Sequence, residues 1–413
     1  MKATFFLILT CITFSLSAQN TIQWRNDRTG IYNETGLLKS WPAKGPELLW
    51  HFDGLGDGWT AITISNEKIY ATGLDKEKLN LFVLDLNGKL LTKKFIGKEL
   101  DDNRYHGTRS QVSISDGKLY IYTALGELFC LDETTLKVVW TKDLFKEFGG
   151  KQVMWGVTEA PLIVGDKIFM TPGGAKHNMV ALNKHTGALI WSSQGTGLLS
   201  SYCSPLYISG YSVPMVVTWA GAIPGGGRGA PQENKLVAFH AETGELLWSE
   251  ILPSGNNINP NTPIYSDGKI FVTTGYRGGS WLFRLTKGGR GVEQIWHNDA
   301  DNQMGGAVKV GNYVYTTGHQ NRAFFCIDWT TGEIKYREAA FPGSAIIYAD
   351  GMLYVYNDKG DMNLIRPNPE KFDLVSKFPI TLGTEQHWAH PVIYKGVLYI
   401  RHGNTLMAYK ISH

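Results

Sequence analysis

The residues of this chain that can bind a ligand gather in short segments just before predicted strands. These segments read "YHGTRSQ", "MWGVTEA", "SSYCSP", "NINPNTP" and "EQHWAHP", and the loops "GYRGGS" and "GHQNRA" add two guanidinium groups. Aromatic faces stack on flat molecules, while arginine and carboxylate groups form charge-assisted hydrogen bonds. We expect a polar, anionic or polyhydroxylated ligand here, unless these groups pair with one another and with water. The candidate ligand-binding residues are Arg109, Trp155, Glu159, Tyr202, Asn261, Arg277, Arg322, His387 and Trp388.

The usual sequence signatures of catalysis are absent. The loop histidines His177, His319 and His402 lack the spacing of zinc ligands, and no G-x-S-x-G or Walker sequence occurs. The "GGGRG" at 225–229 lies in a long loop with no following helix, which does not suit phosphate binding. Trp219 and Trp281, which we expect to be exposed, can stack on sugar rings, but no convincing pair of hydrolytic carboxylates accompanies them. We predict neither catalytic residues nor metal ligands.

A repeated pattern positions the candidate residues. "HTGALIW" at 185–191 recurs as "ETGELLW" at 242–248 and "TTGEIKY" at 330–336, each after a short apolar strand. Upstream of each copy, a turn such as Asp-Gly leads into alternating apolar residues, as in "SDGKLYIYT", which is typical of a β-hairpin. The aromatic residues that end successive copies are 40–57 residues apart. Four strands in a repeat of this length predict the blade of a β-propeller, with the tryptophan filling the space between blades.

The hairpins predict an all-β fold, an eight-bladed β-propeller of four-stranded blades over residues 45–413. The blades begin near residues 59, 109, 155, 202, 261, 304, 344 and 388, and a segment at 19–44 precedes them. The last blade lacks its fourth strand, whereas "GPELLWHF" at 45–52 is a fourth strand with no blade before it. We predict that this strand completes blade eight and closes the ring, which removes exposed sheet edges. The candidate residues then meet on one face, at the mouth of the central channel.

The repeats resemble a known superfamily. "ALNKHTGALIW" and "AFHAETGELLW" resemble the tryptophan-docking motif of the pyrroloquinoline quinone (PQQ)-like β-propellers, and residues 24–50 resemble the start of exported bacterial proteins of that superfamily. The superfamily includes quinoprotein dehydrogenases and also the BamB-type scaffold of outer-membrane protein assembly, which has no cofactor. We favour a binding or scaffold module with no cofactor, because the adjacent cysteine pair typical of the dehydrogenases and a CxxCH haem site are absent.

The alternative that the resemblance implies is a PQQ- and Ca²⁺-dependent dehydrogenase of alcohols or sugars. Glu159, Asn261 and Asp301 follow the acid–amide–acid order in which those dehydrogenases bind calcium, a cation that prefers oxygen ligands. Trp155 or Trp388 would then stack on the quinone, and Arg109 would contact one of its oxygens. Both PQQ and Ca²⁺ are cofactors under this alternative.

The first 18 residues, "MKATFFLILTCITFSLSA", combine a basic residue, an apolar run and a final small residue. This is the pattern of a secretory signal peptide, and the run is short for a membrane anchor. We therefore expect a periplasmic or secreted protein with no transmembrane segment. The remaining cysteines, Cys130, Cys203 and Cys326, are expected to be unpaired and buried.

The overall charge limits the classes of partner that the protein is expected to bind. The net charge is only +3 over 413 residues, and no run of lysine and arginine occurs. A nucleic-acid-binding protein would carry a clustered positive charge, so nucleic acid is not an expected partner. The expected partners are a small polar molecule, a glycan or another exported protein.

Overall fold

The computed structural model describes residues 22–102, 104–174, 176–222, 234–253 and 258–413. The predicted signal peptide at 1–18 and the "GGGRG" at 225–229 lie outside the described residues. Among the described residues, no helix is long and apolar enough to span a membrane.

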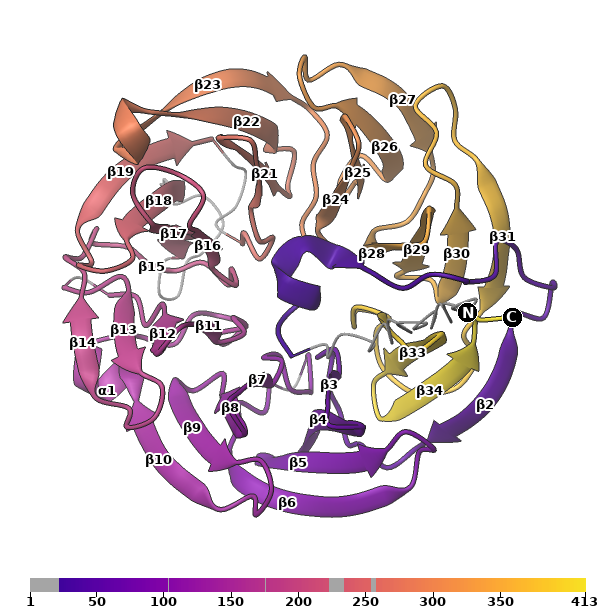
Figure 1. Ribbon diagram of the computed structural model, residues 1–413, viewed down its shortest axis with the longest axis horizontal. Coiled ribbons are helices and arrows are strands. Elements are labelled where there is room, and N and C mark those ends of the chain that lie inside the picture. The colour runs from indigo at the N-terminus through magenta and orange to yellow at the C-terminus, as the bar shows by residue number, and fades with distance from the viewer. Residues whose placement is uncertain (1–21, 103, 175, 223–233, 254–257) are drawn as a thin grey trace, which may run out of the picture.

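The described residues form eight mainly antiparallel sheets around a central channel, so the predicted eight-bladed propeller is confirmed (Figure 1). Within each blade the strands follow one another from the channel to the rim. The first four blades consist of β3 (Thr63–Ser65), β4 (Lys68–Asp75), β5 (Lys78–Asp85) and β6 (Leu90–Lys98); β7 (Ser113–Ser115), β8 (Lys118–Tyr122), β9 (Glu127–Asp132) and β10 (Val138–Asp143); β11 (Leu162–Val164), β12 (Lys167–Met170), β13 (Val180–Asn183) and β14 (Leu189–Ser192); and β16 (Leu206–Ile208), β17 (Met215–Ala222), β18 (Asn234–His240) and β19 (Leu246–Leu252), with β15 (Leu199–Ser200) also paired to β17.

The other four blades follow the same plan. They consist of β20 (Ile264–Ser266), β21 (Lys269–Thr274), β22 (Gly279–Thr286) and β23 (Gly291–Asn298); β24 (Ala307–Val310), β25 (Tyr313–Thr317), β26 (Ala323–Asp328) and β27 (Ile334–Ala339); β28 (Ser344–Ala349), β29 (Met352–Asn357), β30 (Asp361–Ile365) and β31 (Leu374–Pro379); and β32 (Val392–Tyr394), β33 (Val397–His402) and β34 (Thr405–Lys410) with β2 (Glu47–Phe52). Short helical turns are η1 (Asn26–Gly30), α1 (Leu144–Phe148) and η2 (Lys287–Gly289).

The ring closes as the sequence predicts. Strand β2 pairs antiparallel with β34, with Glu47 opposite Lys410 and Phe52 opposite Leu406. Figure 1 shows indigo β2 lying outside yellow β34, so the two ends of the chain share one blade. The last blade therefore has the four strands of the others, and its third strand is not left as an open edge.

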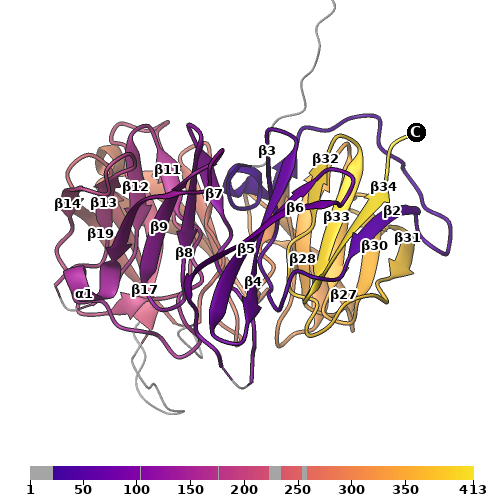
Figure 2. The same cartoon turned by 90° about the horizontal axis from the view of Figure 1, so that it is seen from below.

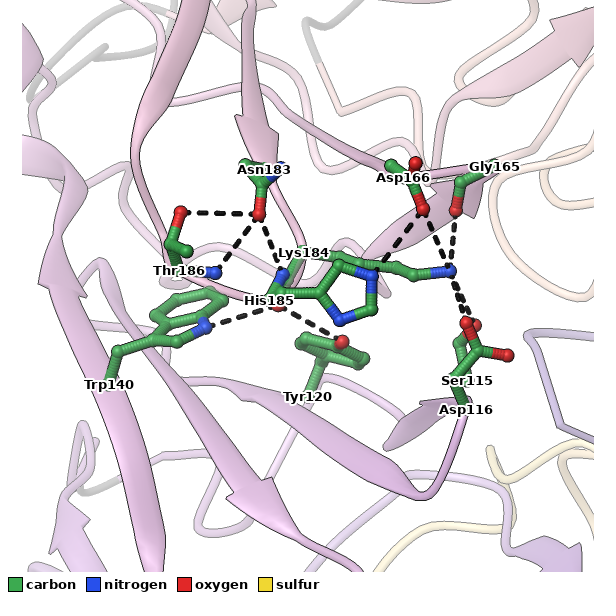
Figure 3. A network of polar contacts seen from close by, with 10 residues as sticks. All are labelled: Ser115, Asp116, Tyr120, Trp140, Gly165, Asp166, Asn183, Lys184, His185 and Thr186. Carbon is green, nitrogen blue, oxygen red and sulfur yellow. Dashed lines mark hydrogen bonds and ion pairs between the residues drawn. The ribbon is translucent and has the colours of Figure 1, made fainter.

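The Thr-Gly turns and tryptophans join neighbouring blades. The indole Nε1 of Trp140 donates to the Lys184 carbonyl of the next blade at 3.1 Å, and a Cβ at Gly187 would lie 2.9 Å from the same indole. The Lys184 ammonium also reaches back across the junction, 2.7 Å from the Asp116 carboxylate (Figure 3). Glycine is required at this turn both for its positive φ and for the close approach of the indole. The same indole-to-carbonyl bond joins Trp50 to Leu86, Trp191 to Ala241 and Trp296 to Trp329.

The three cysteines within the described residues are buried free thiols. Cys130 and Cys326 occupy the third strand of two distant blades, as the repeat predicts. Burial raises the pKa of the Cys203 thiol to about 12. These side chains pack as small apolar groups and are not reactive thiolates.

Candidate functional site

The N-terminal segment enters the central channel, which the sequence did not predict. Figure 1 shows it as the indigo coil at the centre of the ring, and Figure 2 shows it between the blades, toward the side on which the chain ends. Residues Arg25 to Arg28 all have positive φ, between 46° and 67°, a left-handed conformation that is unfavourable for side chains other than glycine. Such strain persists only where the surrounding structure holds the segment in place.

Two buried arginines anchor this segment to four blades. The Arg25 Nη2 donates to the carbonyls of Ala307 and Ile346, at 2.9 and 3.0 Å. On the other side, Arg28 donates to the Pro205 carbonyl through Nε and to the Ala160 carbonyl through Nη2, at 2.5 and 3.0 Å. The segment then leaves the channel and adds β1 (Ile31–Tyr32), parallel to β28, at the inner edge of blade seven. The channel is therefore crossed by protein, and the space beside the segment is a cavity.

This channel cavity has a volume of about 420 Å³. Trp24 and Arg25 of the N-terminal segment line it together with residues that enter the first strands of the blades. The remaining residues that matter for its chemistry are Trp59, Tyr105, Arg109, Trp155, Tyr202, Asn261, Tyr276, Gln303, His319, Trp388 and His390. None of the described residues that line the cavity is a carboxylate. Its uncharged polar groups include hydroxyl, amide and imidazole groups, which can donate or accept, and its two arginines make it electropositive.

Aromatic rings form one wall of the channel cavity. The ring of Tyr105 lies 5.1 Å from that of Trp155 and 5.5 Å from that of Trp388, and Trp388 lies 5.3 Å from Trp59. These centroid separations are typical of favourable edge-to-face and tilted aromatic pairs. The four rings come from the segments that enter four different blades, so their contacts also hold the wall together. The wall offers a flat, apolar body a large contact surface.

Arg109 stands beside this wall. Its guanidinium lies 5.2 Å from the centre of the Trp59 ring and donates to the carbonyls of Gly107 and Tyr105, at 2.6 and 2.8 Å. Burial lowers the pKa of Arg109, and the nearby carboxyl of Glu99 opposes that change. Arg109 makes no ion pair with Glu159 within the described residues; its bonds are to its own loop. Its charge is thus fixed by local backbone bonds and faces the cavity.

The structure brings together some of the predicted site residues and separates others. Arg109, Trp155, Tyr202, Asn261 and Trp388 line the channel cavity. Arg322 and His387 line an adjoining hollow of about 360 Å³, which shares Trp388 and His319 with the channel cavity and contains Asp358. Arg277 and Glu159 line neither space. Whether the residues at the two spaces bind a ligand stays a prediction.

The sequence-predicted calcium ligands do not fit a calcium ion. The Asp301 carboxylate accepts backbone N–H groups of Arg277, His319, Gln320 and Asn321, at 3.0–3.3 Å, and is fully buried. The Glu159 carboxyl is also buried and accepts the N–H of Thr171 at 2.8 Å. Only Asn261 reaches the cavity, and its Oδ1 accepts the N–H of Gly306 at 3.1 Å. A hard cation needs several oxygen ligands directed at one point, and these three residues do not supply them.

His387 belongs to a stacked pair beside the channel. Its ring lies 3.7 Å from that of His402, and its Nδ1 is 2.5 Å from the Tyr356 hydroxyl. Burial and the neighbouring His402 lower the pKa of His387 to about 4. His387 is therefore neutral at pH 7 and cannot supply the positive charge of an anion site.

Sequence reasoning missed several residues of the cavity and misplaced two others. Trp24 and Arg25 entered the sequence analysis only as part of the N-terminal stretch that resembles the superfamily. His319, considered there only as a loop histidine without zinc spacing, lines the cavity and lies edge-on to Tyr276 at 4.6 Å. The expectation that Trp219 and Trp281 are exposed is wrong, because both are almost completely buried in the core of their blades. Both lie in strands, β17 and β22, whose described residues are nearly all buried, and a sugar cannot reach them there.

Comparison with known proteins agrees with this architecture. A family profile described as outer membrane protein assembly factor BamB matches residues 83–208, from β5 to β16. The chain is 24% identical to a quinoprotein ethanol dehydrogenase of Pseudomonas putida over 288 residues, which are 62% of this chain and 45% of that protein. It is 26% identical to the quinoprotein alcohol dehydrogenase PedH of Pseudomonas putida over 192 residues, 45% of this chain and 30% of PedH.

The sequence and the fold of this chain are similar to those of the PQQ-like β-propellers. The fold of this PQQ-like propeller is shared by BamB from Moraxella catarrhalis, with a TM-score of 0.64 and 13% identity over 88% of this chain and 99% of that one. It is shared equally by a europium-containing methanol dehydrogenase, with a TM-score of 0.69 and 13% identity over 95% and 91% of the two chains. The PQQ-like propeller matches less than half the length of the curated dehydrogenases, so their activity is not carried over with the fold.

Proposed function

We propose that this PQQ-like propeller is an exported binding or scaffold module that holds a small polar ligand in the channel cavity. The observation that carries the proposal is the makeup of the cavity: an aromatic wall, two arginines, and no carboxylate among the described lining residues. Preformed pockets with apolar walls and a few directed polar groups are typical of small-molecule sites. The buried, backbone-bonded positions of Glu159 and Asp301 argue against the calcium-dependent dehydrogenase.

The test of the dehydrogenase alternative uses the purified protein with added PQQ and Ca²⁺. Ethanol is the substrate, and reduction of an electron-accepting dye is measured. We expect no ethanol-dependent dye reduction above that of PQQ and Ca²⁺ without protein. Reduction that requires both additions, and that is lost in Glu159→Gln and in Asp301→Asn, would establish the dehydrogenase and overturn this proposal.

The test of the binding site is a thermal-shift screen of small acids, sugars and amides on the wild type and on Trp388→Ala. Trp388 contacts Trp59 and Tyr105 in the wall and lines both spaces. We expect compounds that stabilise the wild type to lose their effect in Trp388→Ala. If every stabilising compound acts equally on both proteins, the channel cavity is not the binding site.

Export is part of the proposal and has its own measurement. Cleavage after Ala18 would leave Gln19 as the first residue, a few residues before Trp24 enters the channel. Cell fractionation and N-terminal sequencing are expected to find the chain outside the cytoplasm, beginning at Gln19. Recovery of the chain in the cytoplasm with its first 18 residues still attached would contradict this expectation.

A further inference from the structure

The channel cavity is lined by a buried positive charge, that of Arg25, which has no carboxylate partner among the described residues. Arg25 is only 3% exposed, and of its three guanidinium nitrogens only Nη2 forms hydrogen bonds; Nε and Nη1 have no partner within the described part of the chain. Neither does any carboxylate of the described residues form an ion pair with it. Burying an uncompensated charge is unfavourable, because the charge loses its hydration without gaining a counter-charge.

Two other buried arginines show that this is not the rule for the fold. Arg28 uses Nε, Nη1 and Nη2 to bind Pro205, Gln23 and Ala160. In the same way Arg401, which is 2% exposed, uses all three nitrogens on Gly403, Thr60, Thr72 and Gly56. Arg25 therefore differs from two side chains of the same type and similar burial.

Other residues of the channel cavity add two unused indole donors and one unpaired imidazole nitrogen. The Nε1 atoms of Trp24 and Trp59 are buried without a hydrogen-bond partner among the described residues, as is Nδ1 of His390. His390 packs edge-on to Trp24 at 4.7 Å, and burial holds its pKa far below the usual range, so the ring is neutral. An indole N–H can only donate, and a neutral imidazole donates from one nitrogen. The natural complement of the two indoles and of Arg25 is a group that only accepts, such as an ionised carboxylate.

We propose that the channel cavity binds an organic carboxylate with a flat apolar body, whose charge is neutralised by Arg25 of the N-terminal segment. The inference rests on the proposed function and specifies its ligand. The carboxylate lies toward Trp24 and Arg25, and the apolar body lies against the wall of Tyr105, Trp155 and Trp388. Burial lowers the pKa of Arg25 to about 10, which still leaves the guanidinium charged at pH 7.

The test is isothermal titration calorimetry of the full chain with 2-naphthoate and with its neutral counterpart, 2-naphthamide. The two probes share a flat apolar body and differ in charge. We expect 2-naphthoate to bind the wild type at least tenfold more tightly than the amide. Absence of 2-naphthoate binding, or equal affinities for the two probes, would overturn the inference.

Two variants assign the charge preference to one side chain. Arg25→Gln is expected to bind both probes with similar affinity, whereas Arg28→Gln, which changes a fully bonded arginine of the same segment, is expected to keep the preference for 2-naphthoate. Circular dichroism tests whether each variant is folded. If a variant does not fold, the relative affinity of the wild type for the two probes still tests the inference. A folded Arg25→Gln that retains the full preference would contradict the role of Arg25.

The failure of this inference is distinguishable from failure of the proposed function. Equal binding of both probes that is lost in Trp388→Ala would keep the channel cavity as the ligand site and reject only the carboxylate. A preference for 2-naphthoate that survives in Trp388→Ala and in Arg25→Gln would place the binding elsewhere and reject both.

Discussion

The sequence predicts that Glu159 binds a ligand, but in the structure its carboxyl group forms hydrogen bonds within the protein. Glu159 precedes β11 in a segment that faces the channel, yet its side chain turns into the protein and binds Thr171. Burial is the main cause that raises the pKa of its carboxyl from 4.5 to about 7, although the bonds from Thr171 and the charge of Arg28 oppose it. In the unfolded chain the carboxyl ionises near its usual pKa.

This difference makes stability depend on pH. Between pH 4.5 and 7 the unfolded chain loses the Glu159 proton while the folded chain keeps it, so the free energy of unfolding falls as the pH rises through this window. The slope from one such group is at most about 1.4 kcal/mol per pH unit. Glu159→Gln should flatten the slope, as measured by urea unfolding at pH 5, 6, 7 and 8. Identical slopes in the variant and the wild type would mean that Glu159 is ionised in the folded protein.

The predictable and unpredictable residues of the site differ in how their positions are determined. Arg109, Trp155, Tyr202 and Asn261 follow from the repeat, because the segment before each first strand always lies at the channel. Arg25 has no such periodic signal: its bonds join it to Ala307 and Ile346, about 300 residues away in the chain. The sequence also does not show the direction of the side chains: Glu159 and Asp301 stand in channel-facing segments, but their carboxyl groups accept backbone N–H groups and line neither space.

At the level of elements, the junction between blades depends on the glycine of the Thr-Gly turn. Gly187 and Gly117 both have positive φ, of 70° and 68°, but a Cβ at Gly187 would contact the Trp140 indole, whereas one at Gly117 would meet nothing within 4 Å. Gly117→Ala should lose about 1–2 kcal/mol of unfolding free energy from the left-handed backbone alone. Gly187→Ala should lose clearly more, because it also displaces Trp140. Equal losses of unfolding free energy in the two variants, measured by urea unfolding, would show that the contact between Gly187 and the Trp140 indole does not contribute to stability.

The N-terminal segment acts as an element that ties opposite blades together. Arg28 bonds to two blades, and each hydrogen bond from a charged donor contributes about 1.5–3 kcal/mol. Arg28→Ala leaves the carbonyls of Pro205 and Ala160 without their donor, so a loss of several kcal/mol and a lower melting temperature are expected. Lys39→Ala, which removes an exposed ion pair with Asp350, is the control and should change the melting temperature little. A melting temperature that is unchanged in Arg28→Ala would show that the segment does not brace the ring.

The repeat made the architecture of the whole molecule predictable. Each blade carries its own turn and strand pattern. The strand at 45–52, which has no blade of its own, predicted the ring closure that β2 and β34 form. What lies inside the ring was not predictable, because "WRNDRTG" has neither a repeat nor an amphipathic period. Its fold is imposed by the blades around it, as the four consecutive left-handed residues show.

The central claim, that the channel cavity is a ligand site, is tested most directly by a crystal structure of the protein saturated with 2-naphthoate. The account predicts the naphthalene body against Tyr105, Trp155 and Trp388, with its carboxylate on the side of Trp24 and Arg25. The same crystals soaked with Ca²⁺ should show no ion at Glu159, Asn261 and Asp301. A cavity that holds only water while 2-naphthoate occupies another surface, or a calcium ion bound by these three residues, would contradict the account.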